Sequence, residues 1–201
     1  MTAREQSVHH ASAAPDSNGA GATTAPLDPD PPERLHLETA YDGDDAFIAQ
    51  WQVIGDIDRA VEACQTALIA HDLVQLRQPA AATVALSHDA AVRVLNRTYR
   101  HQDKSTNVLS FPAPPSPDLD RDAGAPRSLG DVILALESLL AEAVDQDISP
   151  LHHFQHLVVH GVLHLLGYDH ESDADAGVME GLETAILARL GIADPYAEPP
   201  A

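Results

Sequence analysis

Three histidines lie in one short stretch of the sequence, HGVLHLLGYDH at residues 160–170. His160 and His164 are four residues apart, so on a helix their side chains would lie on one face. Gly167 lets the chain leave such a helix and turn back, which would bring His170 toward the same point. Three imidazoles suit a zinc ion, and three protein ligands leave a fourth position open for water or substrate. The spacing therefore predicts one zinc site per chain, of the catalytic rather than the structural kind.

The spacing H-x-x-x-H-x-x-G-x-x-H is the zinc-binding pattern of the metzincin proteases, but one residue of their chemistry is missing. Those enzymes carry a catalytic Glu directly after the first histidine, where this sequence has Gly161. Because zinc alone lowers the pKa of a bound water to about 7, hydrolysis remains feasible with another base. Asp131 and Asp169 are the candidates, and Asp169 is more simply interpreted as a carboxylate that orients a ligand histidine. Sites of three histidines also bind nickel, copper or iron, so zinc is the default metal.

Further histidines lie on the same predicted helix and leave a different set of ligands open. The chain contains 12 histidines, so chance alignments are common. His153 and His156 follow the same helical stripe as His160. We interpret His152, His153 and His156 as surface, supporting or substrate-facing polar residues.

A basic segment lies upstream of the histidines. Four of the 11 lysines and arginines fall within twelve residues, at Arg93, Arg97, Arg100 and Lys104. Steps of four and three residues place the three arginines on one helix face. Such a face suits phosphate recognition, because a guanidinium forks onto anionic oxygens. From the spacing alone, a solvated face that pairs with acidic neighbours is the simpler interpretation.

The composition limits the class of protein. A formal charge of −20 argues against a protein that coats nucleic acid by bulk electrostatics, although a local basic groove remains compatible with it. The one cysteine, Cys64, excludes an internal disulfide, and its apolar helical surroundings predict a small buried hydrophobe. We find neither a secretory signal nor an apolar run long enough to span a membrane. These features predict a cytoplasmic protein that does not contact the membrane.

The hydrophobic pattern predicts an α+β fold, with a sheet of about four strands packed with helices. Residues 1–34 are rich in Ala, Pro, Gly, Ser, Thr and Asp and are predicted to form a disordered extension. Residues 35–197 are predicted to form a single domain. The expected strands are 34–41, 82–87, 106–112 and 129–135, and the expected helices are 56–73, 89–100, 136–147, 150–166 and 173–191.

Polar residues before three of these helices are predicted to cap them. Ser87 or Asp89 would cap the helix 89–100. Ser149 would cap the helix that starts with Pro150 at its first position, and Ser172 would cap the last helix.

Four blocks of the sequence together resemble the YbeY family of bacterial rRNA maturation factors. The resemblance extends from about Leu35 to Tyr196, and the order of the blocks makes chance agreement remote. Ser105 stands where Pro is common in the family, in a loop where we expect little effect. The blocks are LNRTYRHQDKSTNVLSFP (95–112), LGDV (129–132), HGVLHLLGYDH (160–170) and AILARLGIADPY (185–196).

The resemblance implies a zinc-dependent, single-strand-specific endoribonuclease. Such an enzyme would act in rRNA maturation, especially at the 3′ end of the small-subunit rRNA, and in ribosome quality control. Its partners would be single-stranded RNA and the ribosome or ribosome-assembly proteins. The family's metal ligands match His160, His164 and His170, and its functionally important arginine matches Arg100. Lack of the protease Glu is usual in the family, so Gly161 is no defect.

The roles of the basic residues follow from the same resemblance. Arg100 would bind the scissile phosphate and offset charge that develops in the transition state. Arg93, Arg97 and Lys104 are the further candidates for RNA binding. Whether water or the 2′-hydroxyl of the RNA attacks is left open by the sequence.

Two other functions compete with the nuclease. One is a non-catalytic, zinc-containing ribosome assembly factor, which the acidic charge makes reasonable because such a protein would bind other proteins. The other is a metallopeptidase, with Met179 as the methionine of a metzincin turn. Met179 lies in a helical pattern, VMEGLETAILARL, where packing in the core is the simpler interpretation.

Overall fold

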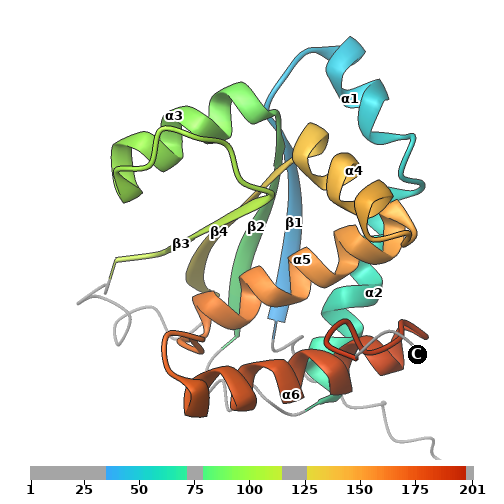
Figure 1. Ribbon diagram of the computed structural model, residues 1–201, viewed down its shortest axis with the longest axis vertical. Helices are drawn as coiled ribbons and strands as arrows, with labels where there is room; N and C mark the ends of the chain where they lie inside the picture. Colours follow the sequence, from blue (N-terminus) through green and yellow to red (C-terminus); the bar gives the residue numbers. More distant parts are fainter. Residues whose placement is uncertain (1–34, 72–78, 115–125, 198–201) are drawn as a thin grey trace, which may run out of the picture. The chain divides into compact units, whose positions relative to one another are not determined.

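A four-stranded sheet forms the centre of the computed structural model, which describes residues 35–71, 79–114 and 126–197 (Figure 1). These ranges all belong to one of the two units of the chain, Pro32–Ala201. The strand order is β1-β2-β4-β3, with β1, β2 and β4 parallel and β3 antiparallel to β4 at the edge. The strands are β1 (Leu35–Tyr41), β2 (Ala80–Ser87), β3 (Val108–Pro112) and β4 (Arg127–Ala135).

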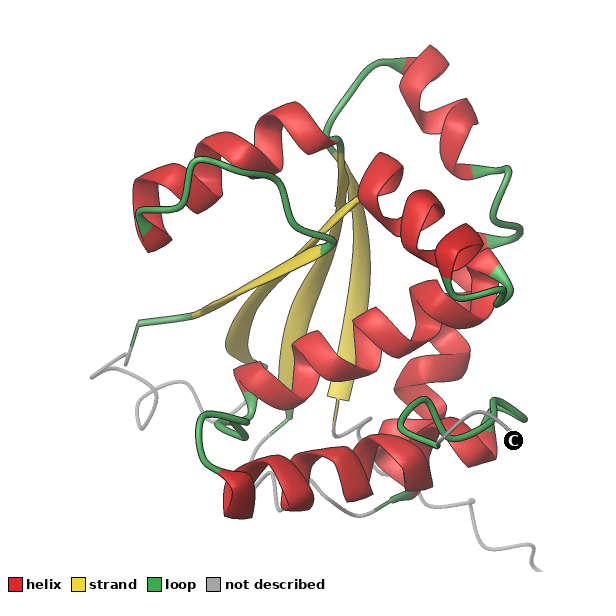
Figure 2. Ribbon diagram, in the orientation of Figure 1, coloured by secondary structure: helices red, strands yellow, loops and turns green. Residues whose placement is uncertain are grey.

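Helices pack around this sheet (Figure 2). The predicted α+β class is confirmed, as are the four strands and five helices expected from the sequence. One short helix, α1, was not expected. The helices are α1 (Asp45–Trp51), α2 (Ile57–Ala70), α3 (Asp89–Arg100), α4 (Leu136–Asp145), α5 (Pro150–Leu165) and α6 (Asp173–Arg189).

Three further predictions concern the N-terminal extension, the ends of the strands and a membrane span. The predicted disordered extension, residues 1–34, lies outside the described residues. Strand β3 starts two residues later than expected and β4 two residues earlier. No helix in the described part of the chain is long and apolar enough to cross a membrane.

The cap of α3 differs from the prediction. His88 occupies the N-cap position, and its Nδ1 accepts a hydrogen bond from the backbone N–H three residues further on at 3.2 Å. The hydroxyl of Ser87 instead donates to Asp42 at 2.9 Å, and the Asp89 carboxylate accepts two hydrogen bonds from Ser138. Both predicted caps are thus engaged in holding neighbouring segments.

The ends of α5 and α6 agree with the sequence pattern. Ser149 precedes Pro150 at the N-cap of α5, although its side chain makes no capping hydrogen bond. Ser172 caps α6 by accepting from the backbone N–H of Asp175 at 3.2 Å. Gly167 ends α5 with a φ of +94°, a left-handed conformation that glycine adopts without steric cost.

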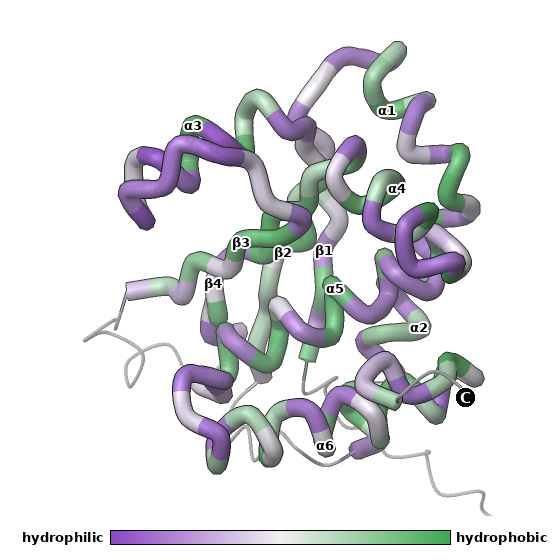
Figure 3. The backbone as a smooth tube through the Cα atoms, viewed as in Figure 1, coloured by the Kyte–Doolittle hydropathy of each residue, from purple (hydrophilic) through white to green (hydrophobic). Residues whose placement is uncertain are grey.

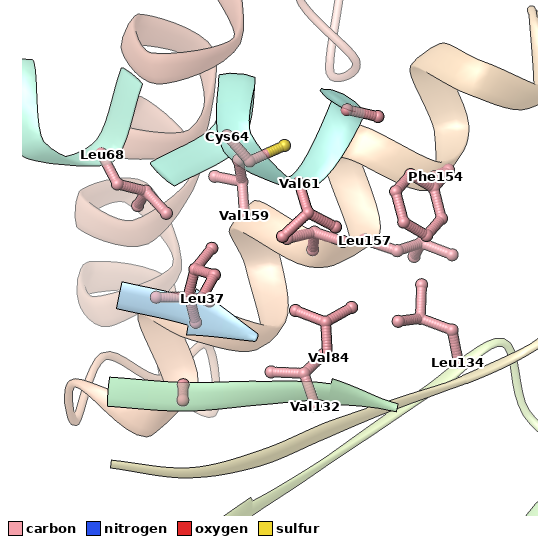
Figure 4. Close-up of a cluster of buried hydrophobic side chains, with 14 of the residues drawn as sticks. Leu37, Val61, Cys64, Leu68, Val84, Val132, Leu134, Phe154, Leu157 and Val159 are labelled. Carbon is pink, nitrogen blue, oxygen red and sulfur yellow. The ribbon is translucent and has the colours of Figure 1, made fainter. Parts of the chain in front are cut away.

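The main core lies between the sheet and the helices α2 and α5 (Figure 4). Cys64 is fully buried there, and burial raises the pKa of its thiol to about 12, as expected for an inert core cysteine. Met179 is also buried in this core, at 1% exposure, which supports its interpretation as a packing residue. The labelled core side chains are Leu37, Val84, Val132 and Leu134 of the strands, Val61, Cys64 and Leu68 of α2, and Phe154, Leu157 and Val159 of α5.

Helices α3 and α5 pack on opposite faces of the edge strand β3. Side chains alternate between the two faces of a strand. Leu109 and Phe111 point to one face and form a small apolar cluster with Val92 of α3. Val108 and Ser110 point to the other face, where Val108 joins the main core and α5 packs. Figure 3 shows that α3 is hydrophilic mainly toward its C-terminal end, whereas the strands and the middle of α5 are more hydrophobic.

Candidate metal centre

The structure brings the three histidines of the motif together. His160 and His164 lie one turn apart on α5, and His170 lies in the segment after the helix turns at Gly167. One ring nitrogen from each histidine lies within 4.8 Å of the others. The His160 and His164 Nε2 atoms are 3.1 Å apart, and the ring of His170 lies 5.5 and 5.1 Å from theirs, centre to centre. The helix and the glycine turn therefore give the convergence that the spacing predicts.

Hydrogen bonds at the far side of each ring decide which nitrogen is free to bind a metal. His160 Nδ1 donates to the carboxylate of Glu183 at 2.8 Å, and His164 Nδ1 donates to the carbonyl of Tyr168 at 3.0 Å. Because both partners accept, the Nδ1 atoms carry the protons, and the Nε2 lone pairs face each other. Two lone pairs at this distance repel unless a proton or a metal cation lies between them, and a third imidazole within reach favours the metal.

The donor set fits zinc. Two nitrogens bound to one tetrahedral zinc at about 2.0–2.1 Å lie about 3.3 Å apart, close to the 3.1 Å between the His160 and His164 Nε2 atoms. Burial lowers the pKa of His164, and the neighbouring His160 and His170 lower it further. A lowered pKa keeps the imidazole neutral, which is the form that binds a metal.

A buried carboxylate supports the site from α6. Glu183 is 0% exposed, and its side chain accepts hydrogen bonds from His160, from His156 Nε2 at 2.9 Å and from the hydroxyl of Tyr196. Burial alone would raise the pKa of this carboxyl, but the three hydrogen bonds outweigh it and bring the pKa down to about 2. Burial and the bond to Glu183 raise the pKa of Tyr196, so its hydroxyl remains a donor. Glu183 is therefore an ionised acceptor within the protein.

The sequence did not point to Glu183. It lies on the helix after the motif, in an apolar pattern that predicted only core packing. The two acids that the sequence did suggest are placed differently. Asp169 accepts from the backbone N–H of His170 at 2.7 Å, and Asp131 is exposed on β4. Neither has a hydrogen bond to a histidine ring within the described ranges, and their proposed roles as base or support stay predictions.

Gly161 occupies a position where no side chain fits. A Cβ atom there would lie 2.4 Å from Cγ1 of Val132 on β4. The hydroxyl of Ser110 on β3 donates to the Gly161 carbonyl at 3.1 Å and ties the helix to the edge strand. The position of the protease Glu therefore faces the sheet at close contact, which explains why the chain has glycine there.

The remaining histidines of α5 have separate places. His153 is 4% exposed and bonds Glu142 of α4 through Nε2 at 2.8 Å. His152 is exposed, while His156 joins Glu183 as described. His156, His160 and Glu183 form a second group whose potential ligand atoms also lie within 4.8 Å of one another.

Three of the basic residues lie on α3, which packs on the face of β3 opposite to α5, and Lys104 lies in the loop after α3. Arg93 forms a two-pronged ion pair with Asp103, at 2.8 and 3.0 Å. Arg97, Arg100 and Lys104 are exposed, and their charged groups make no hydrogen bond or ion pair to any described residue. The predicted contacts of Arg93, Arg97, Arg100 and Lys104 with RNA therefore stay predictions.

The fold and the histidines define a class of protein: an α+β domain with a candidate metal centre of three histidines on and after one helix. Comparison with known sequences gives the family. Residues 48–191 match the family model described as Endoribonuclease YbeY. The chain therefore belongs to the endoribonuclease YbeY family, whose members are nucleases that hydrolyse phosphodiester bonds of RNA. The resemblance and the enzyme class inferred from the sequence are confirmed at the level of the family.

The chain is also similar to individual proteins of known name and to a solved structure. The chain is 46% identical over 149 residues to the "Endoribonuclease YbeY" of Azorhizobium caulinodans, covering 74% of this chain and 91% of that protein. It is 58% identical over 120 residues to that of Rhodospirillum rubrum, covering 60% of each protein. It is also similar to the solution structure of TM1509 from Thermotoga maritima, with a TM-score of 0.42 and 18% identity, over 81% of this chain and 99% of that one.

Proposed function

We propose that the domain at residues 35–197 is a zinc-dependent endoribonuclease that cleaves single-stranded RNA. The observation that carries the proposal is the pair of Nε2 lone pairs of His160 and His164, 3.1 Å apart, with His170 beside them. Membership of the endoribonuclease YbeY family supports the choice of RNA as substrate.

The residues of the chain would supply binding and orientation. His160, His164 and His170 would hold one zinc ion, and the geometry of three ligands leaves a fourth position for water or substrate. Zinc, when bound, lowers the pKa of a water to about 7 or polarises a phosphoryl oxygen. A hollow of about 380 Å³ lies beside His160 and is lined also by His156 and Tyr196, but not by His164 or His170.

Arg100 would bind a phosphate of the same RNA strand. It stands at the C-terminal end of α3, across the edge strand from the histidines. A single strand that crosses this edge would contact both, whereas a stiff duplex would be held away from one of them. Because the net charge of the chain is −20, the attraction of RNA must come from such local basic groups.

The biological setting follows from the family resemblance. We infer maturation of ribosomal RNA, especially at the 3′ end of the small-subunit rRNA, with a part in ribosome quality control. The partners would be the ribosome or its assembly proteins, and the place of action the cytoplasm. The acidic charge of the chain supports contacts with basic ribosomal proteins.

The chemical form of the new RNA ends identifies the group that attacks the phosphate. A 2′,3′-cyclic phosphate at the new end would mean that the 2′-hydroxyl of the RNA attacks, with Asp131 or Asp169 as candidate bases. A simple phosphate end and a free hydroxyl would mean that water attacks.

The proposal is tested by offering the zinc-loaded protein three substrates: a labelled single-stranded rRNA fragment, the same fragment annealed to its complement, and casein. We expect cleavage of the single strand alone. Cleavage of casein would support the peptidase, which the crowded position at Gly161 disfavours. Bound zinc with no cleavage of any substrate would favour the assembly factor with a structural zinc.

A further inference from the structure

We propose that Glu183 is the positioning residue of the metal centre, and that Tyr196 completes it from the segment after α6. In this arrangement, the carboxylate fixes His160 with its Nε2 toward the shared ligand point, and Tyr196 and His156 hold the carboxylate. The inference rests on the proposed metal-dependent activity.

The division of the carboxylate oxygens supports this role. Among the described residues, Oε1 accepts from His160 Nδ1 alone, at 2.8 Å, while Oε2 accepts from both His156 and Tyr196. One oxygen thus serves the candidate ligand, and the other anchors the carboxylate. A carboxylate on the distal nitrogen of a metal-binding histidine sets the tautomer and the ring orientation and raises the basicity of the ligand.

Burial of the Glu183 carboxylate is unfavourable unless its hydrogen bonds are all formed. Removing an ionised carboxylate from water is unfavourable, and good hydrogen bonds return about as much free energy as the removal costs. Packing alone would be served better by an apolar side chain at the position of Glu183, which is 0% exposed. A requirement for a histidine oriented toward a metal accounts for the acid.

A second glutamate–histidine pair on the same helix provides a control. Glu142 bonds His153 at 2.8 Å, the same distance as between Glu183 and His160. The other nitrogen of His153, Nδ1, is buried and has no hydrogen-bond partner among the described residues. The two pairs share their chemistry, but only the pair at Glu183 leads to the three converging histidines.

A rival arrangement uses the same atoms. His156, His160 and Glu183 lie close enough to hold a cation themselves, which would make Glu183 a ligand rather than a support. A second ion between these groups would add a second zinc per chain, and a single ion held there would not need His164 as a ligand.

The test compares zinc affinity, by competition with a chromophoric chelator, for the full-length wild type and the variants E183Q, E142Q and Y196F. Zinc content per chain and thermal unfolding with and without zinc are measured beside it. We expect E183Q to weaken zinc binding by about 10–100-fold, the range for residues that orient metal ligands. We expect Y196F to weaken it by less, and E142Q to change it by under threefold.

Several results would overturn the inference. One is wild-type zinc affinity in E183Q. Another is an equal loss in E142Q, which would mean that both acids only stabilise α5. A third is two zinc ions per chain with one lost in E183Q. If the wild type binds one zinc and E183Q weakens it, but no RNA is cleaved, the nuclease proposal fails while the role of Glu183 stands. Absence of zinc binding by the wild type would overturn both.

Discussion

Helices α3 and α5 flank the same edge strand from opposite faces, yet they present their polar side chains in different ways. On α5, His160 and His164 are partly buried, and each ring is fixed by a hydrogen bond to a defined acceptor. On α3, Arg97 and Arg100 are exposed, and their guanidinium groups form no hydrogen bond or ion pair with a described residue.

This difference fits two kinds of ligand. A metal ion needs donors placed in advance to within a fraction of an ångström, so its ligands are buried and oriented by other residues. A phosphate of a flexible RNA strand can be met by a long side chain that rotates in water. The histidines of the candidate metal centre are thus held in fixed orientations, whereas the exposed arginines of α3 can rotate to meet a phosphate.

Removal of the metal should have the largest effect on RNA cleavage, because the proposed zinc site would then be empty. We expect a strong zinc chelator, followed by its removal, to eliminate cleavage of single-stranded RNA. Added zinc should restore cleavage, whereas magnesium, which prefers oxygen ligands, should not. Gel assays of a labelled RNA measure all three states. Full activity in the metal-free protein would mean that cleavage does not need a metal at the three histidines.

Substitution of an exposed arginine on α3 should have the next largest effect on cleavage. We expect Arg100→Ala to lower the cleavage rate by about 100-fold or more, because a charged group on the transferring phosphate is lost. Arg59→Ala, which removes an exposed arginine of α2 outside the basic segment, is the control and should lower the rate by less. A loss under threefold for Arg100→Ala, measured at saturating zinc, would remove Arg100 from the site.

The contact between α5 and strand β4 can be tested through stability. Gly161→Ala would push a Cβ atom to within 2.4 Å of Val132, so we expect the free energy of unfolding to fall by about 1–3 kcal/mol. Gly181→Ala, in α6, meets no atom within 4 Å and should raise stability by up to about 1 kcal/mol. Urea unfolding of both variants measures the difference. Equal stability of the two would mean that the helix can shift away from the strand.

The smallest effect is expected at Cys64, in the main core. Burial raises the pKa of Cys64 to about 12, so almost no thiolate exists at pH 8. We expect a thiol reagent to leave the folded protein unmodified and to react at once after unfolding in urea. Rapid modification in native buffer would contradict the packing of α2 against the sheet.

Local patterns in the sequence account for much of the fold and for three site residues. Helix α5 has Pro150 at its start, an apolar face and Gly167 at its end, and these signals fix where His160, His164 and His170 lie. The helix α1 was missed because it has only seven residues, too few for a periodic pattern. The choice of His88 as cap was missed because Ser87 and Asp89 beside it are both better capping residues in general.

The support of the metal centre depends on long-range contacts that no spacing encodes. Glu183 lies 23 residues after His160 and reaches it only because α6 packs against α5. Asp131 and Asp169 were suggested as carboxylates that could replace the missing protease Glu, whereas Glu183 lies in a pattern typical of a core helix. The signal available in the sequence was an acid within an apolar helical pattern, with Tyr196 downstream.

The most direct test of the metal-dependent nuclease is cleavage of single-stranded rRNA by the wild type, His164→Ala and His152→Ala, prepared in the same way. His152 is an exposed histidine of the same helix and serves as the matched control. We expect the wild type and His152→Ala to cut the RNA alike, and His164→Ala to lose more than about 100-fold, since a ligand should matter more than a residue that orients one. Equal cleavage by all three would contradict a catalytic site at the three histidines.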